Sequence, residues 1–345
     1  MVKSMGGKVN VYRGQHLEST HDFHAAVVNS EGTLLYYSGN PDRYVFPRSS
    51  MKPFQIIPVL ESGVIEAFSL KGKEISVMCS SHSGEAGHID CVRTILQKGN
   101  LPENALQCGT HIPRDIDNYN DLIRNGGQLT PIFSNCSGKH SGMLLAISHM
   151  GEDIDTYRDA GHPHQLRIIE AICDVCDYPA DRLQISIDGC GVPVHGLPLN
   201  RVALGFSRLA APEKWDKDDH RKRYIAMIRD AMTGNPCMVA GTDRFDTDLM
   251  DTFNGRLVAK GGAEGFQCIG DRESGTGIAV KVEDGNNRAA TVIALEILRQ
   301  LGICSEEEYK SLEKHAKPAI MNARNERVGS IIPDFVLKKH SQVTL

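Results

Sequence analysis

The sequence predicts a mixed α/β (α+β) fold in which one antiparallel sheet, built from both ends of the chain, is covered by helices. Strand-like segments occur at about 9–40 and again at about 255–283, as short apolar runs bounded by turn residues. Between them, from about 88 to 250, the pattern is mostly helical. The simplest packing inserts this helical region between the two halves of the sheet. We therefore expect a single domain over residues 1–345.

The first strands are expected in a β-hairpin. Residues 24–28 and 33–37 are apolar runs on either side of the turn sequence at 29–32, a pattern typical of hairpins. Residues 49–63 then predict a helix that begins at a capping serine and ends at a glycine, with a kink at Pro58. Residues 75–79 predict a short buried strand.

Strands return in the second half of the chain. Residues 184–187 predict one strand inside the helical region. Residues 256–260 and 277–282 predict two more, joined by a glycine-rich connection. The turn sequence at 284–287 leads into a helix over 288–302. No fixed-period repeat interrupts this order.

The composition is that of an ordinary globular protein. Of 345 residues, 41% are hydrophobic and 23% are charged, enough for a large core. The net charge of -5, without a basic stripe, gives no reason to expect a nucleic acid as partner. No apolar run reaches the length of a membrane span, and the first ten residues do not resemble a signal peptide. We expect a cytoplasmic protein whose ten cysteines are reduced.

A Ser-x-x-Lys motif is formed by Ser49 and Lys52. On a helix, residues three apart lie on one face, so Lys52 can reach the Ser49 hydroxyl. Unpaired backbone N–H groups at the helix start can bind a developing oxyanion. Lysine acts as a base only when neutral, which requires burial or a second cation to lower its pKa from about 10.4. The alternative is a helix cap beside a surface lysine.

Two later motifs follow in the order found in acyl-serine enzymes of the penicillin-recognising type, which carry Ser-x-x-Lys, Ser-x-Asn and Lys-Thr-Gly. Here Ser-His-Ser occurs at 81–83 and Lys-Gly-Gly at 260–262, so Ser replaces the Asn and Gly replaces the Thr. The pattern indicates a relative of that fold with a different substrate. Lys260 could pair with Ser81, and the alternative is a charged residue on an edge strand.

Two cysteines, Cys136 and Cys190, each lie in a tight turn that contains glycine. Two thiolates from such loops, with a nitrogen donor, could hold zinc. Buried structural cysteines are the alternative. Cys173 and Cys176 lie within an amphipathic helical pattern and lack a second pair, so we expect them to be packing residues.

Five motifs in this order resemble the rhizobial, thermolabile type of L-asparaginase, the asparaginase II family. The motifs span residues 48–52, 81–85, 135–140, 188–193 and 259–265. The resemblance runs from about Tyr12 to Ile303. It implies hydrolysis of L-asparagine to L-aspartate and ammonia, a fold like that of serine β-lactamases and glutaminases, and a homodimer.

The resemblance also implies the roles of the site residues. Ser49 with Lys52, and Ser81 with Lys260, would form two Ser–Lys couples. Zinc would be surrounded by three residues close to the substrate pocket: Cys136, Lys139 and Cys190. The substrate-binding residues expected are Arg48, His82, Asn135, Lys139 and Asp188. Charge complementarity assigns Arg48 or Lys139 to the substrate α-carboxylate and Asp188 to its α-ammonium group.

Two other functions stay open at this point. In the first, zinc is the catalyst, with Cys136 and Cys190 as ligands and a metal-bound water as nucleophile. In the second, the chain is a non-catalytic ligand sensor related to penicillin-binding proteins. The presence of both serines and both lysines weighs against the sensor.

Overall fold

The computed structural model describes residues 6–217 and 219–341, which form two compact units. Unit 1 takes its described residues from the segments Met1–Ser50, Leu197–Trp215 and Asp248–Leu345. Unit 2 consists of Met51–Gly196 together with the described part of Asp216–Thr247. The single domain expected over residues 1–345 stays a prediction, because two compact units can belong to one domain.

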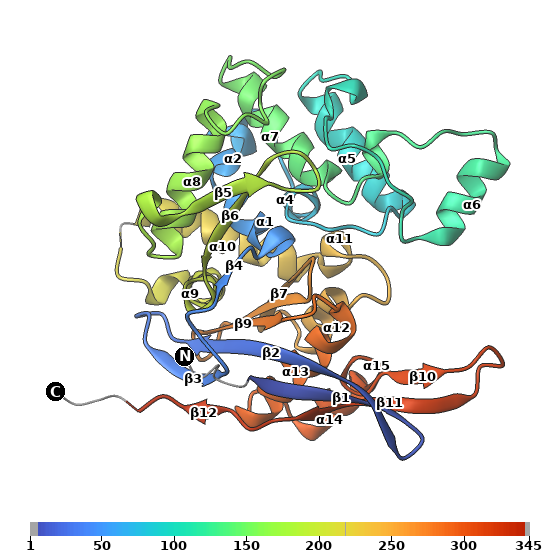
Figure 1. The fold of residues 1–345 in the computed structure, drawn as a ribbon. Coiled ribbons are helices and arrows are strands. Elements are labelled where there is room, and N and C mark those ends of the chain that lie inside the picture. Colours follow the sequence, from blue (N-terminus) through green and yellow to red (C-terminus); the bar gives the residue numbers. More distant parts are fainter. Residues whose placement is uncertain (1–5, 218, 342–345) are drawn as a thin grey trace. The chain divides into compact units, whose positions relative to one another are not determined.

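Unit 1 contains the main sheet, whose paired strands are all antiparallel (Figure 1). The order is β10 (Ala319–Met321), β11 (Arg327–Asp334), β1 (Gly7–Arg13), β2 (His16–Val28), β9 (Thr276–Val282), β8 (Phe266–Asp271) and β7 (Leu257–Gly262). Strand β3 (Leu34–Ser38) pairs with β2 and with β12 (Lys338–Lys339). Both ends of the chain therefore contribute to one antiparallel sheet, as the sequence predicts.

Helices pack against this sheet. The other elements of unit 1 are β4 (Tyr44–Val45), η1 (Arg48–Met51), α9 (Leu199–Ala210), η5 (Pro212–Lys214), α13 (Asn287–Gln300), α14 (Glu306–Ser311) and α15 (Glu313–Ala316), with α12 (Phe245–Thr252) beginning at the end of unit 2. Gly270 and Gly277 are partners across β8 and β9. A Cβ at Gly277 would lie 1.9 Å from the Ala203 carbonyl oxygen, so glycine allows the α9 backbone to approach the sheet closely.

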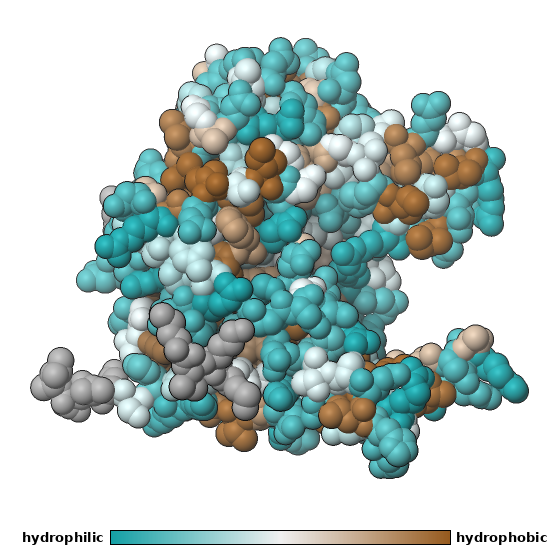
Figure 2. Space-filling view, viewed as in Figure 1, coloured by the Kyte–Doolittle hydropathy of each residue, from teal (hydrophilic) through white to brown (hydrophobic). Residues whose placement is uncertain are grey.

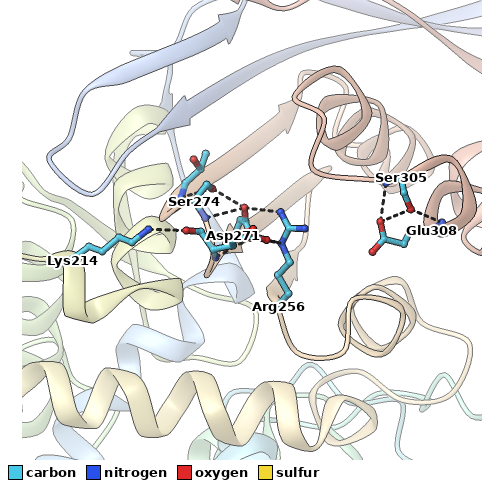
Figure 3. A network of polar contacts seen from close by, with 8 residues as sticks. Lys214, Arg256, Asp271, Ser274, Ser305 and Glu308 are labelled. Atoms are coloured by element: carbon cyan, nitrogen blue, oxygen red, sulfur yellow. Dashed lines mark hydrogen bonds and ion pairs between the residues drawn. The ribbon is translucent and has the colours of Figure 1, made fainter.

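A buried carboxylate, Asp271, holds the turn between β8 and β9 (Figure 3). Arg256 Nε donates to it at 3.0 Å and Ser274 Oγ at 2.7 Å. Burial alone would raise the pKa of Asp271, but these hydrogen bonds and the Arg256 charge lower it. Lys214 Nζ donates to the Glu273 carbonyl in the same turn at 2.8 Å.

Unit 2 is mostly helical. Its elements are α1 (Lys52–Gln55), α2 (Ile57–Glu61), α3 (Val64–Ala67), α4 (Gly72–Met78), α5 (Ala86–Lys98), η2 (Glu103–Ala105), α6 (Ile116–Arg124), η3 (Pro131–Phe133), α7 (Ser137–His149), α8 (Pro163–Val175), η4 (Ala180–Arg182), β5 (Gln184–Ile187), β6 (Pro193–Pro198, whose last two residues belong to unit 1), α10 (Asp219–Gly234) and α11 (Pro236–Val239). Helix α7 is buried over most of its length and packs against α2, α4 and α5.

Several predicted elements are confirmed. The hairpin at 24–37 is the β2–β3 pair, and the Asn29 N–H donates to the Thr33 carbonyl at 3.1 Å in its turn. The helix at 288–302 is α13, and its first turn is capped by the Asn286 side chain. The isolated strand at 184–187 is β5.

The predicted strand at 75–79 is wrong, because residues 75–78 belong to helix α4 and Cys79 is its C-cap. The helix begins after Lys71, whose backbone N–H donates to the Glu74 carboxylate at 2.6 Å, as in a capping box. Residues 74–78 are all buried. A short apolar run buried on all sides does not distinguish a strand from a helix by periodicity.

The helix predicted over 49–63 is divided. A 3-10 turn, η1, precedes α1, and Ile56 separates α1 from α2. Pro58 lacks the N–H that would continue the hydrogen-bond ladder across this point. Gly63 ends the segment with φ of 87°, as predicted. The glycine-rich connection expected between 260 and 277 contains an additional strand, β8.

Across the described ranges 6–217 and 219–341, no helix is both long and apolar enough to cross a bilayer.

Candidate active site

The segment around Ser49 is a strained turn at the end of the first segment of unit 1. Arg48, which is not glycine, has φ of 54°, a left-handed conformation that costs free energy and often occurs at functional sites. Ser49 follows it in the 3-10 turn and is half-buried. The turn is held by Ser50, whose hydroxyl donates to the Lys260 carbonyl at 2.9 Å. Ser49 thus lies on an irregular turn, where the sequence predicted a regular helix.

Lys52, the first residue of α1, is completely buried. Its Nζ donates to the Ser81 hydroxyl at 3.1 Å, to the Asn135 carbonyl at 3.2 Å and to the Ser80 carbonyl. Three oxygen acceptors are the number that an ammonium group can satisfy. Lys52 is therefore not the surface lysine of the alternative interpretation, and it contacts Ser81, a pairing that sequence reasoning did not make.

Lys260 lies on β7 and is only 1% exposed. Its Nζ donates to the Gly261 carbonyl at 2.7 Å. This burial excludes the alternative of a solvated charge on an edge strand. Lys260 belongs to unit 1 and Ser81 to unit 2, and their expected pairing stays a prediction.

Two thiols and a lysine lie together in unit 2. Cys136 immediately precedes α7 and Lys139 is in its first turn. Cys190 comes from the turn after β5, where Gly191 has φ of 84° and its N–H donates to the Asp188 carbonyl at 2.9 Å. Lys139 Nζ donates to Cys190 Sγ at 3.3 Å. The role of these three residues as metal ligands stays a prediction.

Cys136, Cys190 and Lys139 shift one another's pKa values. A hydrogen bond from Cys190, followed by the charges of Lys52 and Lys139, lowers the pKa of the Cys136 thiol to about 5 despite burial. The same hydrogen bond and burial raise the pKa of Cys190. Burial disfavours the Lys139 ammonium, but the two sulfurs and Asp188 raise its pKa. These shifts favour a thiolate at Cys136 and an ammonium group at Lys139.

Buried histidines surround these groups. Burial lowers the pKa of His140 and of His195 to about 4 each, so both rings are neutral near pH 7. The Nδ1 of His140 is 2.6 Å from the Tyr157 hydroxyl. Sequence reasoning assigned no role to His140, Tyr157 or His195. His140 and His195 had a signal, because they lie close in sequence to Cys136 and Cys190, whereas Tyr157 had none.

One of the residues expected to bind substrate, His82, contacts another side chain of the protein. His82 is buried, and its Nε2 is 2.9 Å from the Ser137 hydroxyl. Ser137 already donates to the Ile132 carbonyl at 2.8 Å, so His82 donates from Nε2. Burial, with His88, Lys52 and His111 nearby, holds the pKa of His82 well below its usual range.

The other expected substrate residues divide between the two units. Asn135 presents its carbonyl to Lys52, and its Oδ1 lies 3.2 Å from Cys136 Sγ. Asp188 is half-buried, with Oδ2 3.8 Å from Cys190 Sγ. Arg48 belongs to unit 1. Asn135 and Asp188 therefore lie beside the thiol group, while the substrate roles of all these residues stay predictions.

A zinc ion at these thiols stays a prediction from the sequence. Two sulfurs and an amine nitrogen lie together, and thiolates are the soft ligands that zinc prefers. In the described part of the chain, no three His, Cys, Asp or Glu side chains form a group that could hold a metal. The third ligand would therefore be the Lys139 amine, which must lose its proton first.

The sequence model of the family described as L-asparaginase II matches residues 9–333. No curated protein matches the chain. Among solved structures, a provisionally assigned beta-lactamase from Bacteroides dorei DSM 17855 is similar at 11% sequence identity, with a TM-score of 0.37 over 81% of this chain and 85% of that chain.

Proposed function

Because the chain belongs to the L-asparaginase II family, whose model spans nearly its whole length, we propose that it hydrolyses L-asparagine to L-aspartate and ammonia. Family membership supports the general reaction, amide hydrolysis. The observation that carries the catalytic proposal is the buried Lys52 amine, bonded to Ser81 and three residues beyond Ser49 in the sequence. A buried amine beside hydroxyl groups is suited to accept and return protons.

The first step is attack of the Ser49 oxygen on the side-chain amide carbon of the substrate. Lys52 first releases a proton to solvent, and its neutral amine then takes the Ser49 proton. Backbone N–H groups beside Ser49 stabilise the tetrahedral oxyanion. Collapse of this intermediate breaks the C–N bond and releases ammonia. Water then hydrolyses the β-aspartyl ester, and the proton returns to Ser49.

Ser81 and Lys260 form the second couple in this proposal. Ser81 receives a hydrogen bond from Lys52 at 3.1 Å, so its hydroxyl can pass a proton between Lys52 and the leaving nitrogen. Lys260 is buried, and its positive charge would stabilise negative charge that develops on the reacting atoms. Arg48 or Lys139 would bind the substrate α-carboxylate, and Asp188 its α-ammonium group.

We also propose that zinc is held by Cys136, Lys139 and Cys190. The lowered pKa of Cys136 and the 3.3 Å contact between Lys139 and Cys190 support this set. Zinc bound there would supply positive charge beside the substrate. The test is metal content of the purified protein: Cys136→Ser should lose zinc that the native chain retains. Equal zinc content in both would contradict the assignment.

The decisive experiment compares Ser49→Ala with Ser62→Ala. Ser62 ends α2, and its hydroxyl donates to the Val59 carbonyl, outside the proposed site. Ammonia release from L-asparagine should fall by roughly 1,000-fold or more in Ser49→Ala and stay near the native rate in Ser62→Ala. Hydroxylamine should trap the acyl group as β-aspartyl hydroxamate in the native protein only. Near-normal turnover by Ser49→Ala would contradict the covalent mechanism.

The homodimer implied by the family resemblance is a further part of the proposal. Sedimentation equilibrium at assay concentrations should give twice the chain mass of 37.9 kDa. A single-chain mass throughout the active concentration range would contradict it.

A further inference from the structure

An exposed histidine in the loop before α6, His111, bridges two backbone segments of unit 2. The Asn135 N–H donates to His111 Nε2 at 2.9 Å, and Nδ1 lies 2.9 Å from the Ile112 carbonyl oxygen. A backbone amide only donates, so Nε2 is the acceptor and Nδ1 carries the proton. These two contacts select one tautomer of the neutral imidazole.

Asn135, on the other side of this contact, connects His111 to Lys52. Its carbonyl oxygen accepts from Lys52 Nζ at 3.2 Å. Asn135 lies in the turn between η3 and α7, where no helix or strand ladder determines its backbone angles. Its position therefore depends on individual hydrogen bonds, and the bond to His111 is one of them.

The loop that carries His111 is attached to the segment that carries Ser81. The Asp115 N–H donates to the Ser83 carbonyl at 2.9 Å, and Asn118 Nδ2 donates to the Gly84 carbonyl at 2.5 Å. Gly84 has φ of 82°, and a Cβ there would lie 2.5 Å from Pro113 Cβ. These contacts hold the loop that carries His111 beside the segment that carries Ser81.

Helix α6, which follows this loop, has no buried residue. Ile116 is 53% exposed and Ile123 is 50% exposed, and apolar residues gather on the surface over α6 in Figure 2. Packing of α6 therefore contributes little to holding the loop. The position of the loop therefore depends more strongly on its hydrogen bonds, including the one from the Asn135 N–H to His111.

We propose that His111 is a positioning residue for Lys52. Its Nε2 holds the Asn135 backbone, so that the Asn135 carbonyl directs the Lys52 amine. The proposal rests on the proposed function, in which Lys52 moves the proton of Ser49. Loss of this hydrogen bond lets the carbonyl shift, and a base displaced by a fraction of an ångström transfers protons more slowly. The effect therefore falls on kcat and leaves substrate binding almost unchanged.

The test compares three variants. His111→Phe keeps a planar ring and removes the acceptor, whereas the amide oxygen of His111→Gln can still accept from Asn135. His149→Phe alters an exposed histidine at the end of α7, away from Lys52. We expect His111→Phe to lower kcat about 10-fold with KM changed less than about twofold. His111→Gln should recover most of kcat, and His149→Phe should match the native protein.

Two further measurements separate positioning from a general structural role. Because His111 is exposed, free imidazole should restore kcat to His111→Gly. Hydrogen exchange of the Asn135 amide should be slow in the native protein and faster in His111→Phe, with the melting temperature of both alike. Native kcat in His111→Phe would overturn the proposal, as would a loss of kcat that neither glutamine nor imidazole restores.

The native protein distinguishes this proposal from the proposed function. If it releases no ammonia from L-asparagine, the proposed function fails. The hydrogen-exchange rate of the Asn135 amide then tests the role of His111 independently of catalysis. An amide that exchanges freely in the native protein overturns the positioning role. An amide that exchanges slowly in the native protein and faster in His111→Phe supports it.

Discussion

Several histidines in the described chain are fully buried, and His164 is one of them. Its side chain is inaccessible to solvent, and neither ring nitrogen has a hydrogen-bond partner. Burial, with Arg167 and His162 nearby, lowers its pKa to about 3. The unfolded chain binds a proton near the ordinary value of about 6.5, so acid favours unfolding at this residue.

We predict that His164→Leu reduces the loss of stability in acid. The stability due to neutral His164 is fully present above pH 6.5 and is lost as the pH falls toward 3. Between pH 7.5 and 5, the native protein should lose about 2 kcal/mol more than His164→Leu. Urea unfolding at both values measures this, with His16→Gln, an exposed histidine, as control. Equal losses in native and His164→Leu proteins would contradict the prediction.

Two glycines of helix α7 face α4 in different ways. A Cβ at Gly138 would lie 2.0 Å from the Val77 carbonyl oxygen, which is part of the backbone. A Cβ at Gly142 would lie 2.8 Å from Met78 Sδ, near the end of a flexible side chain. The α4 and α7 backbones are therefore in closest contact at Gly138, in the first turn of the helix.

We predict that Gly138→Ala and Gly142→Ala differ in stability. Alanine gains about 1 kcal/mol of helix propensity at either position. Gly138→Ala also forces two backbones apart, which costs about 3 kcal/mol, the upper end of the usual range for overpacking, so the net loss should be about 2 kcal/mol. Gly142→Ala should stay within about 1 kcal/mol of native, since the methionine can move. Urea unfolding measures both. A Gly138→Ala protein as stable as Gly142→Ala would show that the helices separate easily.

Sequence reasoning succeeded for elements whose patterns are local. The β2–β3 hairpin has its own turn sequence, and α13 has a capping asparagine and an apolar face. It failed for α4 because this short helix is buried all round. Strand β8 was not predicted, because it forms by pairing with β7 and β9, and the local residue pattern does not indicate this pairing.

The same limit applies to the site. The family resemblance implied that Cys136, Lys139 and Cys190 surround a zinc ion, which stays a prediction, and Lys139 contacts Cys190 at 3.3 Å. The bond from Lys52 to Ser81 was not predicted. This hydrogen bond depends on how α1 packs within unit 2, because that packing buries the Lys52 amine beside the segment that carries Ser81.

The sheet of unit 1 requires both ends of the chain. The N-terminal strand β2 pairs with β9, and β1 pairs with β11. Trp215, the single tryptophan of the sequence, is 5% exposed in unit 1, with the Arg208 guanidinium 4.7 Å from its ring centre. Its fluorescence therefore reports on the unit that contains the sheet.

We predict that a chain ending at Arg272 does not form a native unit 1, because β2 loses β9 and β1 loses β11. Trp215 emission should shift to longer wavelength, and proteolysis should become rapid. A chain ending at Leu337 loses only β12 of the described strands and should keep the native spectrum. Native emission from the shorter chain would contradict the prediction.

The pairing of β2 with β9 has a consequence for synthesis of the protein. Translation at about 5–20 residues per second separates the appearance of Val28 from that of Thr276 by an interval on the order of tens of seconds. Throughout this time the buried half of β2, which ends in Ala25-Ala26-Val27-Val28, can pair with β3 on one edge but lacks β9 on the other. Unpaired apolar strands attract other chains. One edge of this apolar segment is thus protected only late in synthesis, and a chaperone that binds nascent apolar segments would find its site there.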